Sequence, residues 1–175
     1  MQYLNKAYLL IGGNVGNRFL YLQMAVKLLN DQCCKVVNKS AIYETAPWGN
    51  SNQGAFLNQA LEVNTEFSAS ELMMRLLNIE EQMGRKRLEK YGPRIIDIDI
   101  LLFNNEVHST PELTVPHAEL QNRQFALRPL SHIAGTVIHP IFHKSIQQLL
   151  EECLDTLDVK EVLPENEEPA LSNSK

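Results

Sequence analysis

The stretch of sequence that decides the fold is Gly92-Pro93-Arg94-Ile95-Ile96-Asp97-Ile98-Asp99-Ile100-Leu101-Leu102-Phe103. Because β-branched and aromatic residues crowd it and Gly-Pro precedes it, we predict a β-strand from Arg94 to Phe103. Successive side chains of a strand point to opposite faces, so Asp97 and Asp99 share one face. The opposite face is expected to hold the apolar residues Ile96, Ile98, Ile100 and Leu102.

Two interpretations of this aspartate pair are open from the strand alone. Residues two positions apart in a strand lie roughly 6.6 Å apart at Cα, and carboxylates at that spacing can bridge a pair of divalent cations. Alternatively, the strand lies at the edge of the sheet and its polar face is solvated. Two like charges beside an apolar run are costly unless positive charge lies between them, so the neighbouring sequence decides.

A basic segment directly before the strand favours the metal interpretation. It contains one acid, Glu89, and five cations, namely Arg85, Lys86, Arg87, Lys90 and Arg94. The guanidinium fork binds phosphate oxygens through two hydrogen bonds. Mg²⁺ is commonly held by one or two carboxylates together with substrate phosphates. We therefore predict a nucleotide-phosphate site in which Asp97 and Asp99 hold the metal.

Length and composition are typical of one soluble globular domain. The 175 residues carry a formal net charge of −5 and are 44% hydrophobic. We expect a single catalytic domain over residues 1–160 and a disordered acidic tail over residues 161–175. The negative charge argues against nucleic-acid binding, and no apolar run approaches the roughly 20 residues of a membrane helix. Three cysteines, two of them adjacent, suggest no disulfide framework, so a cytoplasmic setting is expected. The protein is also expected to be a monomer.

Hydrophobic periodicity and turn residues predict the order β-α-β-β-α-β, that of a ferredoxin-like α+β sandwich. Before the aspartate strand, strands are expected over Lys6–Ile11, Lys35–Glu44 and Phe56–Phe67, and helices over Arg18–Asn30 and from the capping box Ser68–Glu71 to Gly84. After it, we expect further strands and helices: a hairpin through Asn104-Asn105 into Glu106–Ser109, and a helix near Ser145–Leu154. Residues 121–135 have a mixed pattern without a clear assignment.

A glycine-rich turn, Gly12-Gly13-Asn14-Val15-Gly16-Asn17, follows the first strand. A strand, such a turn and a helix invite a phosphate-loop interpretation. However, the turn lacks a Gly-Lys-Ser/Thr ending, and its spacing is not that of a dinucleotide fingerprint. A tight turn that needs positive φ is therefore the favoured interpretation.

Two further groups of residues are candidates for a site. The first combines a hydroxyl, an imidazole, a guanidinium and a ring within a dozen residues: Thr114, His117, Arg123 and Phe125. The second would suit a flat-ring pocket, with aromatic faces for stacking and an amide for edge hydrogen bonds: Trp48, Phe56, Asn58 and Phe125. Ordinary core packing of these rings is the alternative. The other four histidines are expected to be structural or exposed.

Together these segments resemble the 6-hydroxymethyl-7,8-dihydropterin pyrophosphokinase family of folate biosynthesis. The most specific segment is Gly92-Pro93-Arg94-x-x-Asp97-x-Asp99, which is similar to the family signature. The resemblance extends over most of the chain and is further carried by Ile11-Gly12-Gly13-Asn14, Tyr43-Glu44-Thr45 with Pro47, Phe56-Leu57-Asn58, Ile79-Glu80, Gly84-Arg85-Lys86-Arg87, Leu113-Thr114-Val115-Pro116-His117 and Asn122-Arg123-x-Phe125.

The resemblance implies transfer of a diphosphoryl group from ATP to the hydroxymethyl oxygen of the pterin, with release of AMP. These two small molecules would be the partners, and two Mg²⁺ would be held by Asp97 and Asp99. The implied catalytic residues are Arg85, Arg94, Asp97, Asp99, His117 and Arg123. The nucleotide would contact Glu80, Arg85, Arg87, Arg94, Ile100, Leu113, Thr114, His117 and Arg123. The pterin would contact Thr45, Pro47, Trp48, Phe56, Asn58 and Phe125.

Some positions depart from the pattern of the family. Phe56 stands where Tyr is common, which removes a hydroxyl contact and keeps the stacking ring. Tyr91 stands where Trp is often found, and Ala118 stands where a larger ring is found. Leu77 replaces a polar side chain near the nucleotide, so that contact is not carried over.

Two rival functions fit parts of the pattern. A two-metal nuclease or nucleotidyltransferase would use the same aspartate pair, but the net charge of −5 and the confined basic segment do not favour a nucleic-acid substrate. A ferredoxin-like regulatory module that binds a small ligand or a partner leaves the aspartates and arginines without a purpose. AMP formation from ATP and Mg²⁺, measured with and without the pterin, separates all three.

Overall fold

The computed structural model describes residues 5–47, 52–86 and 92–164. One antiparallel sheet contains six strands: β1 (Asn5–Gly13), β2 (Lys35–Lys39), β3 (Ile42–Thr45), β4 (Phe56–Thr65), β5 (Asp97–Phe103) and β8 (Val159–Val162). They lie in the order β5-β1-β4-β3-β8, and β2 also pairs with β4. The predicted ferredoxin-like α+β class is confirmed, and the core elements follow in the predicted order except that the second predicted strand is divided into two.

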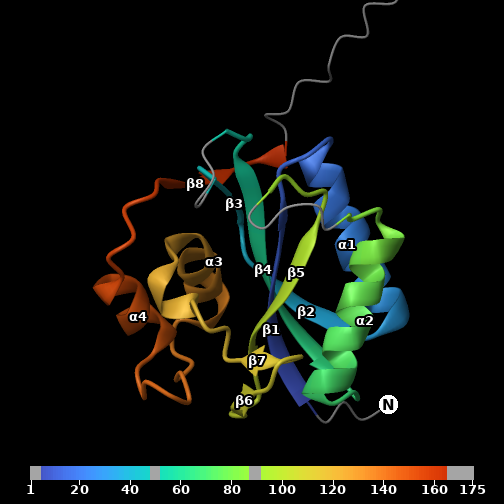
Figure 1. Ribbon diagram of the computed structural model, residues 1–175. Coiled ribbons are helices and arrows are strands. Elements are labelled where there is room, and N and C mark those ends of the chain that lie inside the picture. The colour runs from blue at the N-terminus through green and yellow to red at the C-terminus, as the bar shows by residue number, and fades with distance from the viewer. Residues whose placement is uncertain (1–4, 48–51, 87–91, 165–175) are drawn as a thin grey trace, which may run out of the picture.

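Helices cover both faces of the sheet (Figure 1). On one face, α1 (Arg18–Gln32) and α2 (Ala69–Gln82) bury a first core with the sheet. On the other, α3 (Gln124–Ala134) and α4 (Ile146–Glu152) bury a second, smaller core. A short 3₁₀ helix, Leu120–Asn122, precedes α3. Within the described ranges, no helix is both long and apolar enough to cross a membrane.

Side-chain caps fix where the two helices of the first core begin. The Oδ1 of Asn17 accepts the N–H of Leu20 at the start of α1. At α2, Ser68 and Glu71 each accept the other's backbone N–H, which confirms the predicted capping box. These bonds satisfy N–H groups that have no partner within the helix.

A β-bulge in β5 changes which face its last side chains take. The register of β5 against β1 shifts between Tyr8 and Leu9, which leaves Leu101 as an extra residue. Before the bulge the predicted alternation holds, with the aspartates on the pocket side and the isoleucines in the first core. After it the alternation reverses. Leu102 packs in the second core, so the prediction that it shares a face with the isoleucines is wrong.

The single strand predicted over Lys35–Glu44 is two strands, β2 and β3, which pair with different stretches of β4. The buried Ser40 lies between them. Its N–H donates to the carbonyl of Ala60, and its Oγ accepts the Ala60 N–H, both at 2.9 Å. Because these partners are 20 residues apart, local sequence did not indicate the break.

The chain turns at Asn104 as predicted, but the segment after the turn does not pair with β5 as a hairpin would. Asn104 adopts φ 47°, and its side chain accepts the N–H of Lys6 at the start of β1. The following segment then leaves β5. Strand β6 (His108–Ser109) pairs with β7 (Thr114–Val115) in a separate two-stranded sheet.

The C-terminal part contains α3, which was not assigned, and α4, which was predicted. Pro129 lies inside α3 and lacks the N–H that would bond to the preceding turn, which obscured the helical pattern. Residues on one side of α3 nevertheless form the second core with the sheet, namely Ala126, Leu127, Leu130 and Ala134.

Strand β8 extends the ordered domain beyond its predicted end. It pairs antiparallel with β3, with Val162 opposite Ile42. Because β8 includes Glu161 and Val162, the predicted start of a disordered tail at residue 161 is wrong. The rest of that prediction, residues 165–175, lies outside the described residues.

Close approach explains two of the glycines in the turn after β1. A Cβ at Gly12 would overlap the side chain of Asn58, and a Cβ at Gly13 would overlap the carbonyl of Ile95. Gly16 has φ 69°. The prediction of positive φ therefore holds for Gly16 and is wrong for the other two.

Candidate active site

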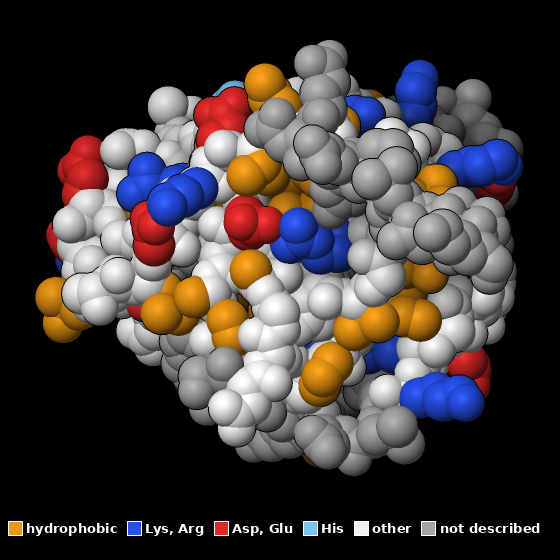
Figure 2. Space-filling view, turned by 90° about the horizontal axis from the view of Figure 1, so that it is seen from above, with side chains coloured by type: hydrophobic (Ala, Val, Ile, Leu, Met, Phe, Trp, Pro, Cys, Tyr) orange, Lys and Arg blue, Asp and Glu red, His pale blue; other side chains and the backbone are white. Residues whose placement is uncertain are grey.

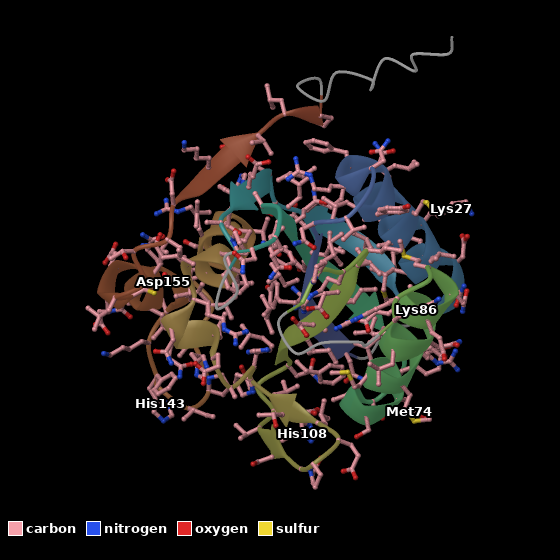
Figure 3. All side chains as sticks on the ribbon, turned by 45° about the horizontal axis from the view of Figure 1, so that its top comes forward. Lys27, Met74, Lys86, His108, His143 and Asp155 are labelled. Atoms are coloured by element: carbon pink, nitrogen blue, oxygen red, sulfur yellow. The ribbon has the colours of Figure 1, made fainter. Side chains whose placement is uncertain are left out.

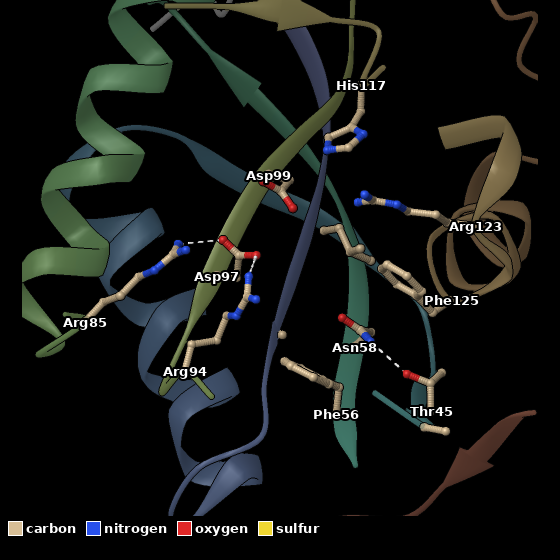
Figure 4. A pocket seen from close by; sticks show the side chains of 13 residues that line it. Thr45, Phe56, Asn58, Arg85, Arg94, Asp97, Asp99, His117, Arg123 and Phe125 are labelled. Atoms are coloured by element: carbon tan, nitrogen blue, oxygen red, sulfur yellow. Dashed lines mark hydrogen bonds and ion pairs between the residues drawn. The ribbon is translucent and has the colours of Figure 1, made fainter. Parts of the chain in front are cut away.

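A pocket of about 340 Å³ opens on the α3 side of the sheet, where β1, β4 and β5 lie side by side (Figure 4). Seen from above, hydrophobic, acidic and basic side chains lie next to one another near the middle of the molecule (Figure 2). The pocket is lined by Leu10, Gly12, Thr45, Ala46, Phe56, Asn58, Arg85, Arg94, Asp97, Asp99, His117, Arg123 and Phe125.

The register of β1 against its two neighbours explains why residues far apart in sequence meet here. Gly12 lies opposite Asn58 on β4 and opposite Asp97 on β5. Leu10, two residues earlier, lies opposite Asp99. Since Gly12 has no side chain, the groups on both of its neighbours can face the same space. The sheet thus places a carboxylate pair and an amide on two sides of one glycine.

Two arginines neutralise Asp97. Nη1 of Arg85 lies 2.6 Å from Oδ1, and Nη1 of Arg94 lies 2.8 Å from Oδ2 (Figure 4). Burial alone would raise the pKa of Asp97, but the two guanidinium charges and their hydrogen bonds outweigh it and hold the pKa below its ordinary value. Asp97 is therefore a carboxylate that stays ionised at neutral pH.

Asp99 has the opposite electrostatic environment. Its carboxylate forms no ion pair or hydrogen bond with other described residues. Burial and the negative charges of Asp97 and Glu80 raise the pKa of Asp99 to about 8. A divalent cation between the two aspartates would offset this excess of negative charge, so the donor set fits such an ion.

Further metal ligands would come from outside the protein. No group of three or more His, Cys, Asp and Glu side chains suited to a metal occurs in the described ranges. Mg²⁺ commonly keeps several waters and binds one or two carboxylates plus substrate phosphates. A site with two carboxylates, Asp97 and Asp99, agrees with this coordination preference.

Glu80 lies outside the pocket and binds two of the residues that position its charged groups. It is 3% exposed, and its Oε1 accepts the N–H of Ile98, between the two aspartates, at 2.7 Å. The same oxygen lies 2.8 Å from Nη1 of Arg85. Glu80 was predicted to contact the nucleotide, but it does not line the pocket. Its contacts instead orient Arg85 and β5. This also explains a buried acid in the last turn of α2, where the helix dipole disfavours it.

His117 and Arg123 face the Asp99 side of the pocket (Figure 4). Nδ1 of His117 accepts the N–H of Glu119 at 3.2 Å, which leaves Nε2 to carry the proton of the neutral ring. Burial lowers the pKa of His117, and the charge of Arg123 lowers it further. His117 is therefore a neutral hydrogen-bond donor at neutral pH.

The other end of the pocket is formed by rings and neutral polar groups. Phe56 and Phe125 line it from β4 and from the start of α3. Between them Asn58, 6% exposed, donates from Nδ2 to Oγ1 of Thr45 at 3.4 Å. Because both rings line the pocket, the flat-ring interpretation is favoured over core packing. This end is called the ring end below, and the end around Asp97 and Asp99 is called the charged end.

Two cations connect the ends through the aromatic faces. The guanidinium of Arg94 lies 5.5 Å from the ring centroid of Phe56, and that of Arg123 lies 5.7 Å from the ring centroid of Phe125. Both distances are within the range of a cation–π contact. Each ring is therefore in cation–π contact with an arginine that lines the pocket near Asp97 or Asp99.

Several predicted residues do not line the pocket. Ile100 and Leu113 are buried in the first core, and Thr114 is exposed on β7. Pro47 is described but is not a lining residue. The predicted contacts of Arg87 and Trp48 lie outside the described residues, as does Tyr91.

Two lining residues were missed, Leu10 and Gly12. Gly12 was treated as a turn residue because local sequence gives no strand register. Its position opposite both Asn58 and Asp97 becomes visible only when β1 is paired with two other strands.

The four remaining histidines lie outside the pocket, as predicted. His108 and His143 lie at the periphery of the molecule (Figure 3). His132 accepts the N–H of Ala41, and His139 is buried and accepts a backbone N–H of its own loop.

The chain is similar to known proteins of one family. Residues 8–135 match the family described as 7,8-dihydro-6-hydroxymethylpterin-pyrophosphokinase (HPPK). A relative from Aquifex aeolicus, named 2-amino-4-hydroxy-6-hydroxymethyldihydropteridine pyrophosphokinase, is 41% identical over 145 residues, which cover 83% of this chain and 90% of the relative. A relative of the same name from Bacillus subtilis is 44% identical over 134 residues, which cover 76% and 80%.

The fold is similar to a solved structure of Plasmodium falciparum HPPK-DHPS with pterin and p-hydroxybenzoate. The TM-score is 0.68 at 19% identity, over 85% of this chain and 41% of that chain. The protein therefore spans less than half the length of that structure, and this likeness concerns the fold. Because the family match covers more than half of the sequence and two relatives of the same name align over most of it, the chain belongs to the 7,8-dihydro-6-hydroxymethylpterin-pyrophosphokinase family, whose members are diphosphotransferases of folate biosynthesis.

Proposed function

We propose that the protein transfers the diphosphoryl group of ATP to the hydroxymethyl oxygen of 6-hydroxymethyl-7,8-dihydropterin and releases AMP. The observation that carries the proposal is the presence of a ring end and a charged end in one pocket. Aromatic faces suit a flat heterocycle, while carboxylates and guanidiniums suit a polyphosphate with its metal. Such a pocket suits a transfer in which both substrates are bound side by side.

Asp97 and Asp99 would hold two Mg²⁺, which when bound would offset the charge of the phosphates. The shared face of the two carboxylates supports this assignment, as does the raised pKa of Asp99, since a bound cation would favour the ionised form of this carboxyl. Arg85 and Arg94 neutralise the charge of Asp97. Phosphate oxygens would compete with Asp97 for these guanidiniums, so we expect both arginines to turn towards the nucleotide when it binds.

His117 and Arg123 would bind the phosphates near the bond that breaks. A neutral His117 donates through Nε2–H, and Arg123 supplies a fixed positive charge for the departing AMP. No side-chain nucleophile is needed, because phosphoryl-type transfer depends on positioning and charge stabilisation. Nucleotide contacts of Arg87, Ile100, Leu113 and Thr114 rest on the family resemblance.

The pterin would lie between Phe56 and Phe125, with Asn58 and Thr45 at its edge. The position of both rings in the pocket and the buried amide of Asn58 support this arrangement. A buried amide discriminates strongly among ligands, since a ligand without the matching groups would leave it unsatisfied. Pro47 and Trp48 would extend this end of the site.

We further infer a single catalytic domain that acts as a cytoplasmic monomer and binds neither nucleic acid nor membrane. The three free cysteines and the net charge of −5 support this inference. Size-exclusion chromatography with light scattering tests the oligomeric state.

AMP formation from ATP tests the function. With Mg²⁺ present, AMP should form when 6-hydroxymethyl-7,8-dihydropterin is added and not when it is omitted. Removal of divalent cations with EDTA should stop the reaction, and excess Mg²⁺ should restore it. AMP formation that does not depend on the pterin, or none under any of these conditions, would contradict the proposal.

A further inference from the structure

Arg123 occupies the single position between two helices, the 3₁₀ helix Leu120–Asn122 and α3. Its backbone is extended, with φ −127° and ψ 104°, and it is the N-cap residue of α3. Ser, Thr, Asp and Asn are preferred at an N-cap because their side chains accept an N–H of the first turn. Arginine has donors and no acceptor, and its side chain makes no cap hydrogen bond here. A residue that lines the pocket therefore occupies the position at which α3 would ordinarily be capped.

Asp155 supplies an acceptor at this place from 31 residues further along the chain. Its Oδ2 accepts the N–H of Gln124, the first residue of α3, at 3.0 Å. Its Oδ1 accepts the N–H of Leu157 at 3.0 Å, which holds the carboxylate in its own turn. The helix dipole also favours a negative charge at this end of α3. Asp155 is half-buried and lies beyond the end of α4, outside the pocket that Arg123 lines (Figure 3).

The start of α3 carries one residue for each end of the pocket. Arg123 faces the Asp99 side, and Phe125 lines the ring end (Figure 4). The carbonyl of Arg123 accepts the N–H groups of Ala126 and Leu127, at 3.1 Å and 3.0 Å. The direction in which Arg123 and Phe125 point is thus set by the first turn of α3, whose first N–H is bound by Asp155.

We propose that Asp155 is a positioning residue that acts through the first turn of α3 on Arg123 and Phe125. The inference rests on the proposed function, in which Arg123 assists the departing AMP and Phe125 stacks on the pterin. Without the carboxylate, the N–H of Gln124 loses this acceptor and the first turn frays. Arg123 then spends less time in the position that the transfer requires, whereas the aspartates on β5 keep theirs.

Steady-state kinetics of AMP formation test this role. Asp155→Ala should lower kcat at saturating pterin about tenfold, through Arg123. It should also weaken pterin binding several-fold, through Phe125. Calorimetry measures that affinity in the presence of Mg²⁺ and α,β-methylene-ATP, whose bond between the α and β phosphorus atoms cannot be cleaved in the transfer. Asp155→Asn keeps one oxygen acceptor and should retain more of both, and circular dichroism verifies the fold of each variant.

A double-mutant cycle separates positioning from a general loss of stability. In the Arg123→Ala background, Asp155→Ala should no longer lower kcat, because the group that it positions is absent. In the Arg85→Ala background the two losses should multiply, since Arg85 is bound by Glu80 and Asp97 and not by α3. A further tenfold loss of kcat in the Arg123→Ala background would overturn the proposal.

Ser145→Ala is the matched control, since Ser145 caps α4 by accepting the N–H of Gln148. Both Ser145→Ala and Asp155→Ala remove a helix cap and should lower the melting temperature by about 2–4 °C. Only Asp155→Ala should change kcat and the pterin affinity. Equal kinetic losses in Ser145→Ala would show that destabilising this layer is sufficient, and would overturn the proposal.

Hydrogen exchange gives a readout that does not depend on activity. The N–H of Gln124 should exchange faster in Asp155→Ala and stay slow in Ser145→Ala. Equal protection of this amide in Asp155→Ala and in the unmodified protein would contradict the positioning role. Absence of pterin-dependent AMP formation by the unmodified protein would instead contradict the proposed function.

Discussion

The charged end and the ring end of the pocket are built in different ways. At the charged end the groups already bind one another, since Arg85 and Arg94 both contact Asp97. At the ring end, Phe56 and Phe125 line an open part of the pocket. Binding of phosphates to these arginines therefore requires an exchange of ion pairs, whereas binding between the two rings displaces no ion pair seen among the described residues.

This difference predicts different sensitivities to substitution. A charge removed from a buried, preorganised site changes electrostatic interactions that act on the transition state, typically by about 10²–10³-fold in rate. Removal of an aromatic face costs about 1–3 kcal/mol of stacking in the bound complex. Substitutions at the two ends should therefore differ in the size of their effect and in the substrate that they affect.

The largest effect is expected for the aspartates. Asp97→Ala or Asp99→Ala should lower the rate of AMP formation about 10³-fold, because each removes a carboxylate that would hold the metal. The rate is measured at saturating Mg²⁺, with circular dichroism to verify the fold. Asp158→Ala is the control, since Asp158 is exposed and pairs only with Lys160 in the described structure. Near-normal turnover by either pocket variant would refute the metal assignment.

At the ring end, Phe125→Ala should weaken pterin binding about 10–100-fold and leave binding of α,β-methylene-ATP nearly unchanged. The ring would supply a stacking face to the pterin alone. Calorimetry with each ligand measures both affinities, and Phe142→Ala, an exposed ring outside the pocket, is the control. Equal losses for the two ligands would show that the two ends are not separate.

Glu80 tests whether the charged end depends on support from outside the pocket. Glu80→Gln keeps an oxygen for the N–H of Ile98 but removes the charge that holds Arg85. We expect about a tenfold loss in kcat/KM and a weaker apparent affinity for Mg²⁺, as is typical when an outer partner of a metal site is changed. Glu81→Gln, at the exposed neighbouring residue, should have no effect. Identical kinetics of the two variants would contradict the supporting role.

Sequence alone predicted the groups of the charged end well, because their chemistry is local. The two aspartates share a face by the period of a strand, and the arginines lie in the segment just before it. The face of Leu102 was predicted wrongly because the bulge at Leu101 depends on pairing with β1. A period-2 pattern contains no signal for such a bulge.

Residues that act through tertiary contacts were harder to predict. The support from Glu80, and the hydrogen bonds of the Asn14 side chain with the backbone of Arg94 and of Gly54, depend on strands and loops distant in sequence. The ring end was proposed from residue types, but its assembly requires the register of β4 and the position of α3. The start of α3 carries Phe125, and that helix was itself missed because Pro129 lies within it.

The pKa of Asp99 predicts a stability cost at the charged end. Folding raises this pKa from an ordinary value near 3.8 to about 8, so the folded protein keeps a proton that the unfolded chain releases. The contribution of Asp99 to the free energy of unfolding therefore falls as pH rises between these two values, by at most about 1.4 kcal/mol per pH unit. Below the lower value, both states are protonated and this cost is absent.

Asp99→Asn replaces the carboxylate with a neutral group and should remove this cost. In metal-free buffer its melting temperature should exceed that of the unmodified protein by about 2–4 °C or more near pH 8, and the difference should vanish near pH 4. Millimolar Mg²⁺ should stabilise only the unmodified protein and narrow the gap. A gap that is independent of pH, or an Asn variant that is less stable at pH 8, would contradict the electrostatic origin. No such gain is expected at the ring end, which contains no group of this kind.

The smallest effect is expected for Phe56→Tyr. The substitution adds one oxygen at the ring edge and keeps the face that would stack on the pterin, beside the guanidinium of Arg94. A new hydrogen bond contributes on the order of 0.5–1 kcal/mol, so pterin affinity should change by about fivefold at most.

Asp97→Asn is an equally small change in shape at the other end. It removes the charge that pairs with Arg85 and Arg94 and should cost about 10²-fold in rate. Measuring pterin affinity and AMP formation for both variants compares the two ends through substitutions that change the side chain by a similar amount. If Phe56→Tyr costs as much as Asp97→Asn, the ring end is as tightly specified as the charged end.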